Sequence, residues 1–458
     1  MPDLFFTPKN IAVIGATANP KKFGNAVTLN ILKNKNLKSK LFLVTQNSKE
    51  IMDIPCFQSI LDITEEIELA IILVPAKAVN VIVNECITKK VKRIIIVTAG
   101  FGDLNDEGKQ AEESIAEKCR MNNIRMMGPN CVGIQNNEIG LNASFIQAAP
   151  LGNISMISQS GSFGCASFYA MERENIGCSK FANIGNNVDI SFVDILDYFS
   201  GDPNTKIISL YMETISQGVR FLELLKEIIP KKPIVIFKGG RSVTGMKAAS
   251  SHTGSIATNY KMLKAAIKQG GATLCESASD FIIALKTFSF LPIPQGDKIG
   301  VLTNSGGSSV LFSDKVEDFG LTLVEFSNNL REKIKIHLIS LVKFVNPLDM
   351  IGVAGEKQYY EVTKAMLEDP GIDIVVPCLV IPPFLEMRSD EHYRGMIRAW
   401  NDTNRKKPII PLIFFGEDFE ELRKFAESEK APIFYTPQEA AFAVKILVER
   451  SRIVNKEL

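Results

Sequence analysis

Short runs of β-branched and apolar residues alternate with amphipathic stretches along this chain, and this alternation limits the folds open to it more than any other feature. Up to about residue 147 the apolar runs are NIAVIG, LFLV, AIILV, RIIIVTAG and IRMM. The stretches at 25–34, 78–88 and 106–121 have the apolar spacing of helices. Strands that alternate with helices form a parallel sheet covered on both faces. The sequence therefore predicts an α/β fold with doubly wound parallel sheets.

Chain length and the continued alternation predict three such domains. A chain of 458 residues exceeds what a single hydrophobic core usually supports. The alternation continues from Gly152 to Phe290 and resumes after LPIPQGD, whose prolines interrupt any helix. We expect domains at residues 1–147, 148–290 and 298–458, joined by a linker at 291–297.

Charge and cysteine content argue against several classes of protein. With 52 basic and 51 acidic residues the net charge is +1, so no strong field exists to hold nucleic acid. The eight cysteines are scattered without a CxxC pair, which predicts reduced thiols rather than disulfides or a zinc site. The start, MPDLFFTPKN, does not have the pattern of a signal peptide, and the apolar runs are too short to span a bilayer. We expect a cytoplasmic protein that has no metal site and binds neither nucleic acid nor membrane.

Turn residues follow the predicted strands of the first domain, at the edge where such sheets bind ligands. The turns are Gly15-Ala16-Thr17, Val74-Pro75-Ala76, Thr98-Ala99-Gly100-Phe101 and Gly128-Pro129-Asn130-Cys131. The glycine spacing after Gly15 does not match the GxGxxG of dinucleotide sites. The end of the second strand, Thr45-Gln46-Asn47, also lacks the carboxylate that would hold a ribose. We therefore disfavour NAD and leave another nucleotide-bearing ligand open.

A segment of the second domain recurs in the third. When Ile154 is placed on Ile299, ISMISQSG aligns with IGVLTNSG, and each segment reads as a strand, a Ser/Gly turn and a helix. The turn residues are Ser160, Gly161 and Ser162 in one copy and Ser305, Gly306 and Gly307 in the other. A Ser/Gly turn that opens a helix presents unpaired N–H groups and the positive end of the helix dipole, which suits an anion. One such turn is weak evidence, because small residues also allow tight turns, but two in the same register favour a phosphate site between facing domains.

One histidine of the three in the chain stands apart from the others. His252 lies in AASSHTGSIA, among small residues that leave an imidazole uncovered, after the strand PIVIF. His337 lies in EKIKIHLISL, which suits a core-facing helix, and His392 lies in the charged run RSDEHYRGM, typical of a solvated face. Glu213 follows the strand KIISLYM at the same predicted sheet edge as His252. A carboxylate there can fix the imidazole tautomer and leave a neutral nucleophile, although a surface ion pair explains Glu213 equally well.

The ordered set of motifs resembles one family over nearly the whole chain. AASSHTGSIA, Glu213 in SLYME, the turns SQSGSFG and TNSGGSS, and the segments VIGAT, ILVPAKAV, TAGF and GPNCVG are similar to the α subunit of ADP-forming acyl-CoA synthetases of the acetyl-CoA synthetase type. These proteins are related to succinyl-CoA synthetase. The resemblance implies a Rossmann-like CoA-binding domain followed by two flavodoxin-like ligase domains.

The resemblance also implies a reaction and a role for each motif. Acyl-CoA, ADP and phosphate give free acid, CoA and ATP through an acyl phosphate and a phosphohistidine at His252, which Glu213 orients. The phosphate would lie on Ser160, Gly161, Ser162, Ser305, Gly306 and Gly307. CoA, a substrate rather than a permanently bound cofactor, would lie over Gly15, Ala16, Thr17, Val74, Pro75, Ala99, Gly100 and Asn130.

The chain departs from the family after the second strand and lacks one domain. The family usually reads VNPK where this chain has Thr45-Gln46-Asn47, so a proline and a lysine near the CoA are missing. Three doubly wound domains leave no segment for an ATP-grasp domain. The ADP and its Mg²⁺ would therefore bind to a separate β subunit, which implies an α2β2 heterotetramer.

Two other functions remain open on the sequence. The CoA scaffold could serve an acyltransferase-associated or carbamoyltransferase-like relative without phosphohistidine, or a non-catalytic CoA-sensing module. His252 and Glu213 together favour the ligase over both. The residue pattern does not identify the acyl group, although we expect acetyl first. It also does not distinguish ADP from GDP.

Overall fold

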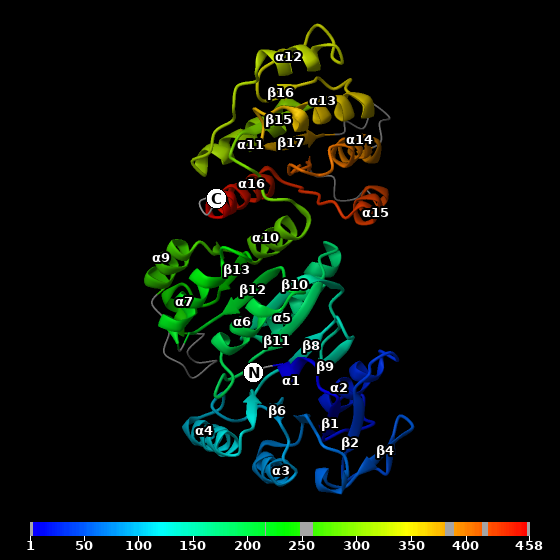
Figure 1. The fold of residues 1–458 in the computed structure, drawn as a ribbon, viewed down its shortest axis with the longest axis vertical. Helices are drawn as coiled ribbons and strands as arrows, with labels where there is room; N and C mark the ends of the chain where they lie inside the picture. The colour runs from blue at the N-terminus through cyan, green and yellow to red at the C-terminus, as the bar shows by residue number, and fades with distance from the viewer. Residues whose placement is uncertain (1–2, 216, 248–259, 381–388, 415–419, 456–458) are drawn as a thin grey trace. The chain divides into compact units, whose positions relative to one another are not determined.

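The computed structural model describes residues 3–215, 217–247, 260–380, 389–414 and 420–455. The chain divides into two compact units, Met1–Glu276 and Ser277–Leu458. Two sheets lie in the first unit and one in the second, and Figure 1 follows the chain through each of them. All three consist largely of parallel strands with helices between them, which confirms the predicted α/β class.

The first sheet has the strand order β3-β4-β2-β1-β5-β6-β7. Its strands are β1 (Asn10–Ile14), β2 (Lys40–Val44), β3 (Glu50–Ile51), β4 (Ile54–Phe57), β5 (Leu69–Ile72), β6 (Arg93–Ile96) and β7 (Arg125–Met127). The central strands β1, β5 and β6 are buried almost throughout, as expected for parallel strands with helices on both faces. The helices of this region are α1 (Asp3–Phe6), α2 (Phe23–Leu32), α3 (Ala76–Thr88) and α4 (Asp106–Met121).

Helix α4 shows how the sequence fixes an element. The side chain of Asn105 accepts a hydrogen bond from Gly108 N at 2.8 Å and so caps the first turn. Acidic residues occupy the first turn and basic residues the last, which complements the helix dipole. Helix α4 has the bounds that the sequence predicts, 106–121.

The second sheet has the order β14-β13-β12-β10-β11-β8-β9. Its strands are β8 (Gly133–Asn136), β9 (Leu141–Ser144), β10 (Leu151–Ser158), β11 (Cys178–Asn183), β12 (Ile207–Met212), β13 (Ile234–Lys238) and β14 (Thr273–Cys275). Its helices are α5 (Gly161–Arg173), α6 (Phe192–Gly201), α7 (Gly218–Ile228) and α9 (Tyr260–Gly270). Strands β8 and β9 pair antiparallel at one edge, although both lie within the segment 1–147 that the sequence assigns to the first domain.

The second unit contains a smaller parallel sheet with the order β16-β15-β17-β18. Its strands are β15 (Ile299–Thr303), β16 (Leu348–Asp349), β17 (Ile374–Leu379) and β18 (Leu412–Ile413). Its helices are α10 (Ala278–Phe290), α11 (Gly306–Asp318), α12 (Asn328–Lys335), α13 (Glu356–Glu368), α14 (Ser389–Asp402), α15 (Glu420–Glu429) and α16 (Pro437–Val454). Helix α10, expected to close the second domain, belongs to this unit, where it contacts α16. The predicted domain boundaries stay predictions.

Two histidines differ from their predicted settings. His337 lies in a turn two residues after α12 ends, not within the helix. His392 is 1% exposed, not solvated: its ring packs edge-on against Tyr359, and Nε2 lies 3.1 Å from the carbonyl oxygen of Ala354. The prediction for His392 was wrong because its helix, α14, turns a buried apolar face inward despite its charged residues.

All eight cysteines carry free thiols, as their scattered positions predict. Burial raises the pKa of Cys131, Cys119 and Cys178 to about 12, so these thiols stay protonated. Within the described ranges, no helix has the length and apolar character needed to cross a membrane.

Candidate active site

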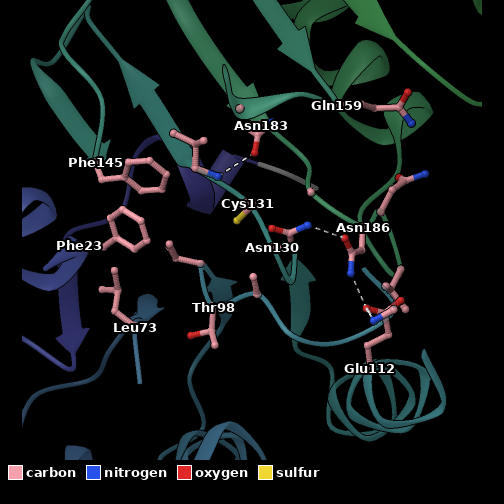
Figure 2. Close-up of a pocket in the computed structure, with 18 of the residues that line it drawn as sticks. Phe23, Leu73, Thr98, Glu112, Asn130, Cys131, Phe145, Gln159, Asn183 and Asn186 are labelled. Atoms are coloured by element: carbon pink, nitrogen blue, oxygen red, sulfur yellow. Dashed lines mark hydrogen bonds between the residues drawn. The ribbon is translucent and has the colours of Figure 1, made fainter. Parts of the chain in front are cut away.

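The carboxyl ends of strands from both sheets of the first unit border one cavity of about 1460 Å³. Figure 2 shows part of its lining. Of the residues predicted from the sequence, those in contact with the cavity are Gly15, Val74, Pro75, Ala99, Asn130, Ser160, Gly161 and Ser162. The other predicted CoA-binding residues, Ala16, Thr17 and Gly100, lie at the same strand ends but do not line it. The cavity thus joins the predicted CoA-binding turns to one predicted phosphate turn.

Hydrogen bonds hold three neighbouring turns of the first sheet together. Thr98 donates from Oγ1 to the carbonyl oxygen of Val74 at 2.7 Å. The backbone N–H of Asn130 donates to the carbonyl oxygen of Thr98 at 3.0 Å, and Asn130 has a left-handed backbone, φ 57°. The turns after β5, β6 and β7 therefore form one connected floor to the cavity.

Asn186 extends this floor to helix α4, a feature the sequence reasoning missed. Asn130 Nδ2 donates to Asn186 Oδ1 at 3.2 Å, and Asn186 Nδ2 donates to Glu112 Oε2 at 2.7 Å. Figure 2 shows Asn186 between the two side chains. Burial raises the pKa of Glu112, against the hydrogen bonds that its carboxylate accepts from Asn186 and Gly102. Asn186 and Glu112 are far apart in the sequence, and no motif in the sequence predicts that they are in contact.

Aromatic side chains border a different part of the cavity. Phe23 at the start of α2 stacks on Phe145, with ring centroids 4.4 Å apart and an angle of 22° between the planes. Phe145 follows β9, so the stack joins the first sheet region to the second within this unit. Leu73 lies near the pair in Figure 2, which makes this part of the lining apolar.

The turn at Ser160 opens α5 as the sequence predicts. Ser160 is the N-cap residue and accepts a hydrogen bond from Phe163 N at 3.3 Å, while Ser158 Oγ donates to the carbonyl oxygen of Ser160 at 2.6 Å. A Cβ on Gly161 would lie only 2.3 Å from Cγ2 of Val132, so a side chain does not fit there without rearrangement. Free N–H groups of the first helical turn and the helix dipole make this a suitable anion site.

Glu213 follows β12 beside this turn and is 8% exposed. Gln159 Oε1 accepts hydrogen bonds from the backbone N–H of Glu213 and, at 2.9 Å, from that of Thr214. Tyr211 donates from its hydroxyl to Glu213 Oε1 at 3.2 Å. Burial lowers the pKa of Lys238, at the end of the next strand, and the charge of Glu213 opposes that shift. Gln159 and Tyr211 were not predicted as site residues.

His252 lies outside the described residues. The described chain stops at Lys247 after β13 and resumes at Tyr260, where α9 begins. Glu213 and the Ser160 turn are thus the described parts of the predicted catalytic group.

The second predicted phosphate turn lies in the other unit and has the same local form. Ser305 is the N-cap residue of α11, and Thr303 Oγ1 donates to the carbonyl oxygen of Ser305 at 2.8 Å. Among the described residues, only Asp349 Oδ2 lies near the position of a Cβ on Gly306, at 3.4 Å, and none lies within 4 Å of a Cβ on Gly307. A carboxylate therefore lies beside the start of α11.

Family models match three consecutive parts of the chain. A CoA binding domain matches residues 9–137, a succinyl-CoA ligase like flavodoxin domain matches 151–288, and a ligase-CoA domain matches 299–420. These matches follow the order predicted from the sequence motifs.

Relatives match the chain almost from end to end. It is similar to the α subunit of acetate–CoA ligase (ADP-forming) II of Pyrococcus furiosus, with 37% identity over 99% of each chain. The acetate–CoA ligase (ADP-forming) I of Archaeoglobus fulgidus is 34% identical, and the match covers 99% of this chain but 64% of that protein.

Solved structures give the same result. The acetyl-coenzyme A synthetase 1 of Ca. Korarchaeum cryptofilum, solved with phosphate and ADP, superposes with a TM-score of 0.94 at 31% identity and covers 100% of this chain and 99% of its own. Sequence identity, domain order and fold agree, and this chain belongs to the family of ADP-forming acetate–CoA ligase α subunits.

Proposed function

We propose that this chain is the subunit of an ADP-forming acyl-CoA ligase that binds the acyl-CoA and forms the phosphohistidine. The overall reaction converts acyl-CoA, ADP and phosphate to free acid, CoA and ATP. The observation that carries the proposal is the cavity itself, because both Asn130 and the N-terminus of α5 line it. A volume of about 1460 Å³ exceeds that of most small-molecule sites, so it has room for a long substrate and a phosphate.

In this proposal CoA lies along the turns of the first sheet, over Gly15 to Thr17, Val74-Pro75 and Ala99-Gly100. Its thioester end lies near Asn130, which is already held by Thr98 and Asn186. Phosphate lies at Ser160, Gly161 and Ser162, where the helix dipole and N–H groups favour an anion. Ser305, Gly306 and Gly307 would hold a phosphoryl group in the second unit, against the charge of Asp349.

The chemistry proceeds by two displacements before ADP reacts. A phosphate oxygen attacks the thioester carbonyl carbon, the C–S bond breaks, and CoA leaves as the thiol once the thiolate takes a proton. A ring nitrogen of His252 then attacks phosphorus, and the carboxylate of the free acid leaves. Glu213 accepts a hydrogen bond from the other ring nitrogen, which fixes the tautomer and stabilises the positive ring.

The phosphoryl group then passes to ADP on a second subunit. We propose an ATP-grasp β subunit that holds ADP with Mg²⁺, in an α2β2 assembly. Two observations support a second subunit: relatives that are named α subunits match this chain from end to end, and the A. fulgidus ligase is longer than this chain. Free thiols at all eight cysteines suit a reducing compartment, and we propose the cytoplasm.

Labelled phosphate tests the proposal. The chain is mixed with acetyl-CoA, or another acyl-CoA from a panel, and [32P]phosphate, and the protein is then examined for acid-labile, base-stable label. We expect label in the wild type, no label in His252→Asn, and full label in His337→Asn, which removes a histidine outside the site. Addition of β subunit and ADP should transfer the label to ATP.

The CoA-sensing alternative predicts a different result in the same experiment. A sensing module would bind CoA but carry no label with any acyl-CoA in the panel. Equal labelling of wild type and His252→Asn would also contradict the phosphohistidine mechanism.

A further inference from the structure

Two side chains position Glu213: one binds the backbone at this residue, and the other, a phenol, binds its carboxylate. Gln159 fixes the backbone at the end of β12, whereas Tyr211 bonds the carboxylate itself, at 3.2 Å from Oε1. Side chains two residues apart on an extended backbone point to the same face. Tyr211 of β12 and Glu213, which directly follows β12, therefore lie on the same side of the sheet. The phenol therefore helps to set the direction of the carboxylate.

The ring of Tyr211 is itself held in place. It stacks on Phe163, with ring centroids 4.1 Å apart and planes at 21°, and Phe237 packs against it at 5.8 Å. Phe163 belongs to the first turn of α5, and its N–H bonds to Ser160 Oγ. The orientation of Tyr211 is thus coupled by direct contacts to the turn proposed to hold phosphate.

The backbone near the phenol leaves room for its hydroxyl. A Cβ on Gly239 would lie 2.5 Å from Tyr211 Oη and 3.4 Å from Glu213 Cγ. Any side chain at this position would collide with the hydroxyl. Glycine at 239 therefore permits the bond between Tyr211 and Glu213.

The repeat provides an internal comparison. Ser158 of β10 pairs with Tyr211 of β12, and the corresponding Thr303 of β15 pairs with Cys378 of β17. Two residues further along, Glu213 corresponds to Val380. The second unit has a valine and a cysteine where the first has this carboxylate and phenol, although it retains the serine N-cap and the two hydrogen bonds between the Asn304 amide and the Val380 backbone.

We propose that Tyr211 is a positioning residue that aims the Glu213 carboxylate during phosphoryl transfer. The inference rests on the proposed function, since its effect passes through Glu213 to His252. Burial and the Glu213 charge raise the pKa of Tyr211 far above its usual value, so the phenol remains a hydrogen-bond donor at physiological pH.

Tyr211→Phe tests the proposal because it keeps the stacked ring and removes only the hydroxyl. We expect the single-turnover rate of labelling from acetyl-CoA and [32P]phosphate to fall about 10- to 100-fold, the range for loss of a hydrogen bond to a charged group. The dissociation constants of CoA and phosphate, measured by calorimetry, should stay within about twofold, because Tyr211 is not among the residues that line the cavity. Tyr198→Phe removes a phenol that stacks on Phe6 in the same unit, away from the cavity, and should label at the wild-type rate.

A second variant keeps the test valid if Tyr211→Phe is poorly folded. Gly239→Ala displaces the same hydroxyl from the other side and should slow labelling, and the double variant should be less impaired than the two effects combined. Labelling of Tyr211→Phe at the wild-type rate, or additive effects in the double variant, would overturn the role of Tyr211 but leave the proposed function intact. Absence of label from the wild type would overturn the proposed function and this inference with it.

Discussion

The helix that begins at Gly161 and the helix that begins at Gly306 start in the same way, but their neighbours differ. Each follows a buried strand, has a serine N-cap, and is preceded by a hydroxyl that donates to the carbonyl oxygen of that serine. An amide side chain next to each turn bonds the backbone after the adjacent strand: Gln159 bonds Thr214, and Asn304 bonds Val380. The two predicted phosphate turns therefore share these local hydrogen bonds.

The strands beside the two turns carry different charges. Ser158 pairs with Asn183, and the corresponding Thr303 pairs with Asp349. Asn183 Oδ1 accepts a hydrogen bond from Val132 N at 2.7 Å, so this neutral amide is part of the backbone framework. Asp349 instead places a carboxylate beside α11. On the other side, Glu213 and Tyr211 correspond to Val380 and Cys378, so at these matched positions the first unit has the carboxylate and phenol proposed to act with His252 and the second unit does not.

The largest difference in stability should appear at the two glycines. Gly161→Ala places a Cβ 2.3 Å from Val132 Cγ2, and we expect a loss of about 1–3 kcal/mol in the free energy of unfolding from overpacking. Among the described residues the Cβ of Gly306→Ala meets only Asp349 Oδ2, at 3.4 Å, so this variant should change the free energy of unfolding by less than about 0.5 kcal/mol. Chemical denaturation of both variants provides the measurement. Similar losses in the two would show that the turns are equally packed.

A smaller difference should appear at the N-caps. Ser160 Oγ accepts a hydrogen bond from Phe163 N, so Ser160→Ala should cost about 1 kcal/mol. The side chain of Ser305 makes no such cap bond, so Ser305→Ala should lower the free energy of unfolding by only about 0.3 kcal/mol. Thermal unfolding compares the two variants, and a larger shift for Ser305→Ala would contradict the assigned caps.

The smallest effect concerns the charge beside each turn. Asp349→Asn removes a carboxylate from the positive end of α11, and we expect phosphate to bind about two- to fivefold more tightly. Asn183→Asp makes the reverse exchange beside α5 and should weaken phosphate binding by at least as much. Calorimetric titration with phosphate measures both. Weaker binding by Asp349→Asn would indicate that this carboxylate supports the anion instead of repelling it.

The fold was predictable where the apolar period was strong. Helix α4 has the predicted bounds, and α3 begins two residues before the predicted 78–88 and ends where predicted. Strands β8 and β9 were not predicted because GIQN and LNAS carry polar side chains that are buried and bonded to one another or to backbone, as in the 3.2 Å contact of Gln135 with Ser144. His392 had a signal that was overlooked: Tyr393, Met396, Ile397 and Trp400 are buried at helical spacing around it.

The candidate site was predictable in its strand ends but not in their connections. Topology places Asn130, Ser160 and Glu213 at carboxyl ends of strands, so motif positions sufficed for them. Asn186 lies in a loop after β11, and its partner Glu112 lies on the buried side of α4, so their contact depends on packing that spacing does not encode. Tyr211 had a usable signal, since a residue two positions before a strand-end carboxylate shares its face.

We propose that phosphoryl transfer to His252 takes place at the Ser160 turn because Glu213 lies beside that turn. The most direct test measures single-turnover labelling by [32P]phosphate and acetyl-CoA in wild type, Glu213→Gln and Asp349→Asn. We expect Glu213→Gln to label about 100- to 10,000-fold more slowly than wild type, the range for loss of a group that assists proton and charge movement at the nucleophile, and Asp349→Asn to label at least as fast as wild type. Labelling of Glu213→Gln at the wild-type rate, or loss of label in Asp349→Asn alone, would show that the chemistry does not depend on Glu213 at the Ser160 turn.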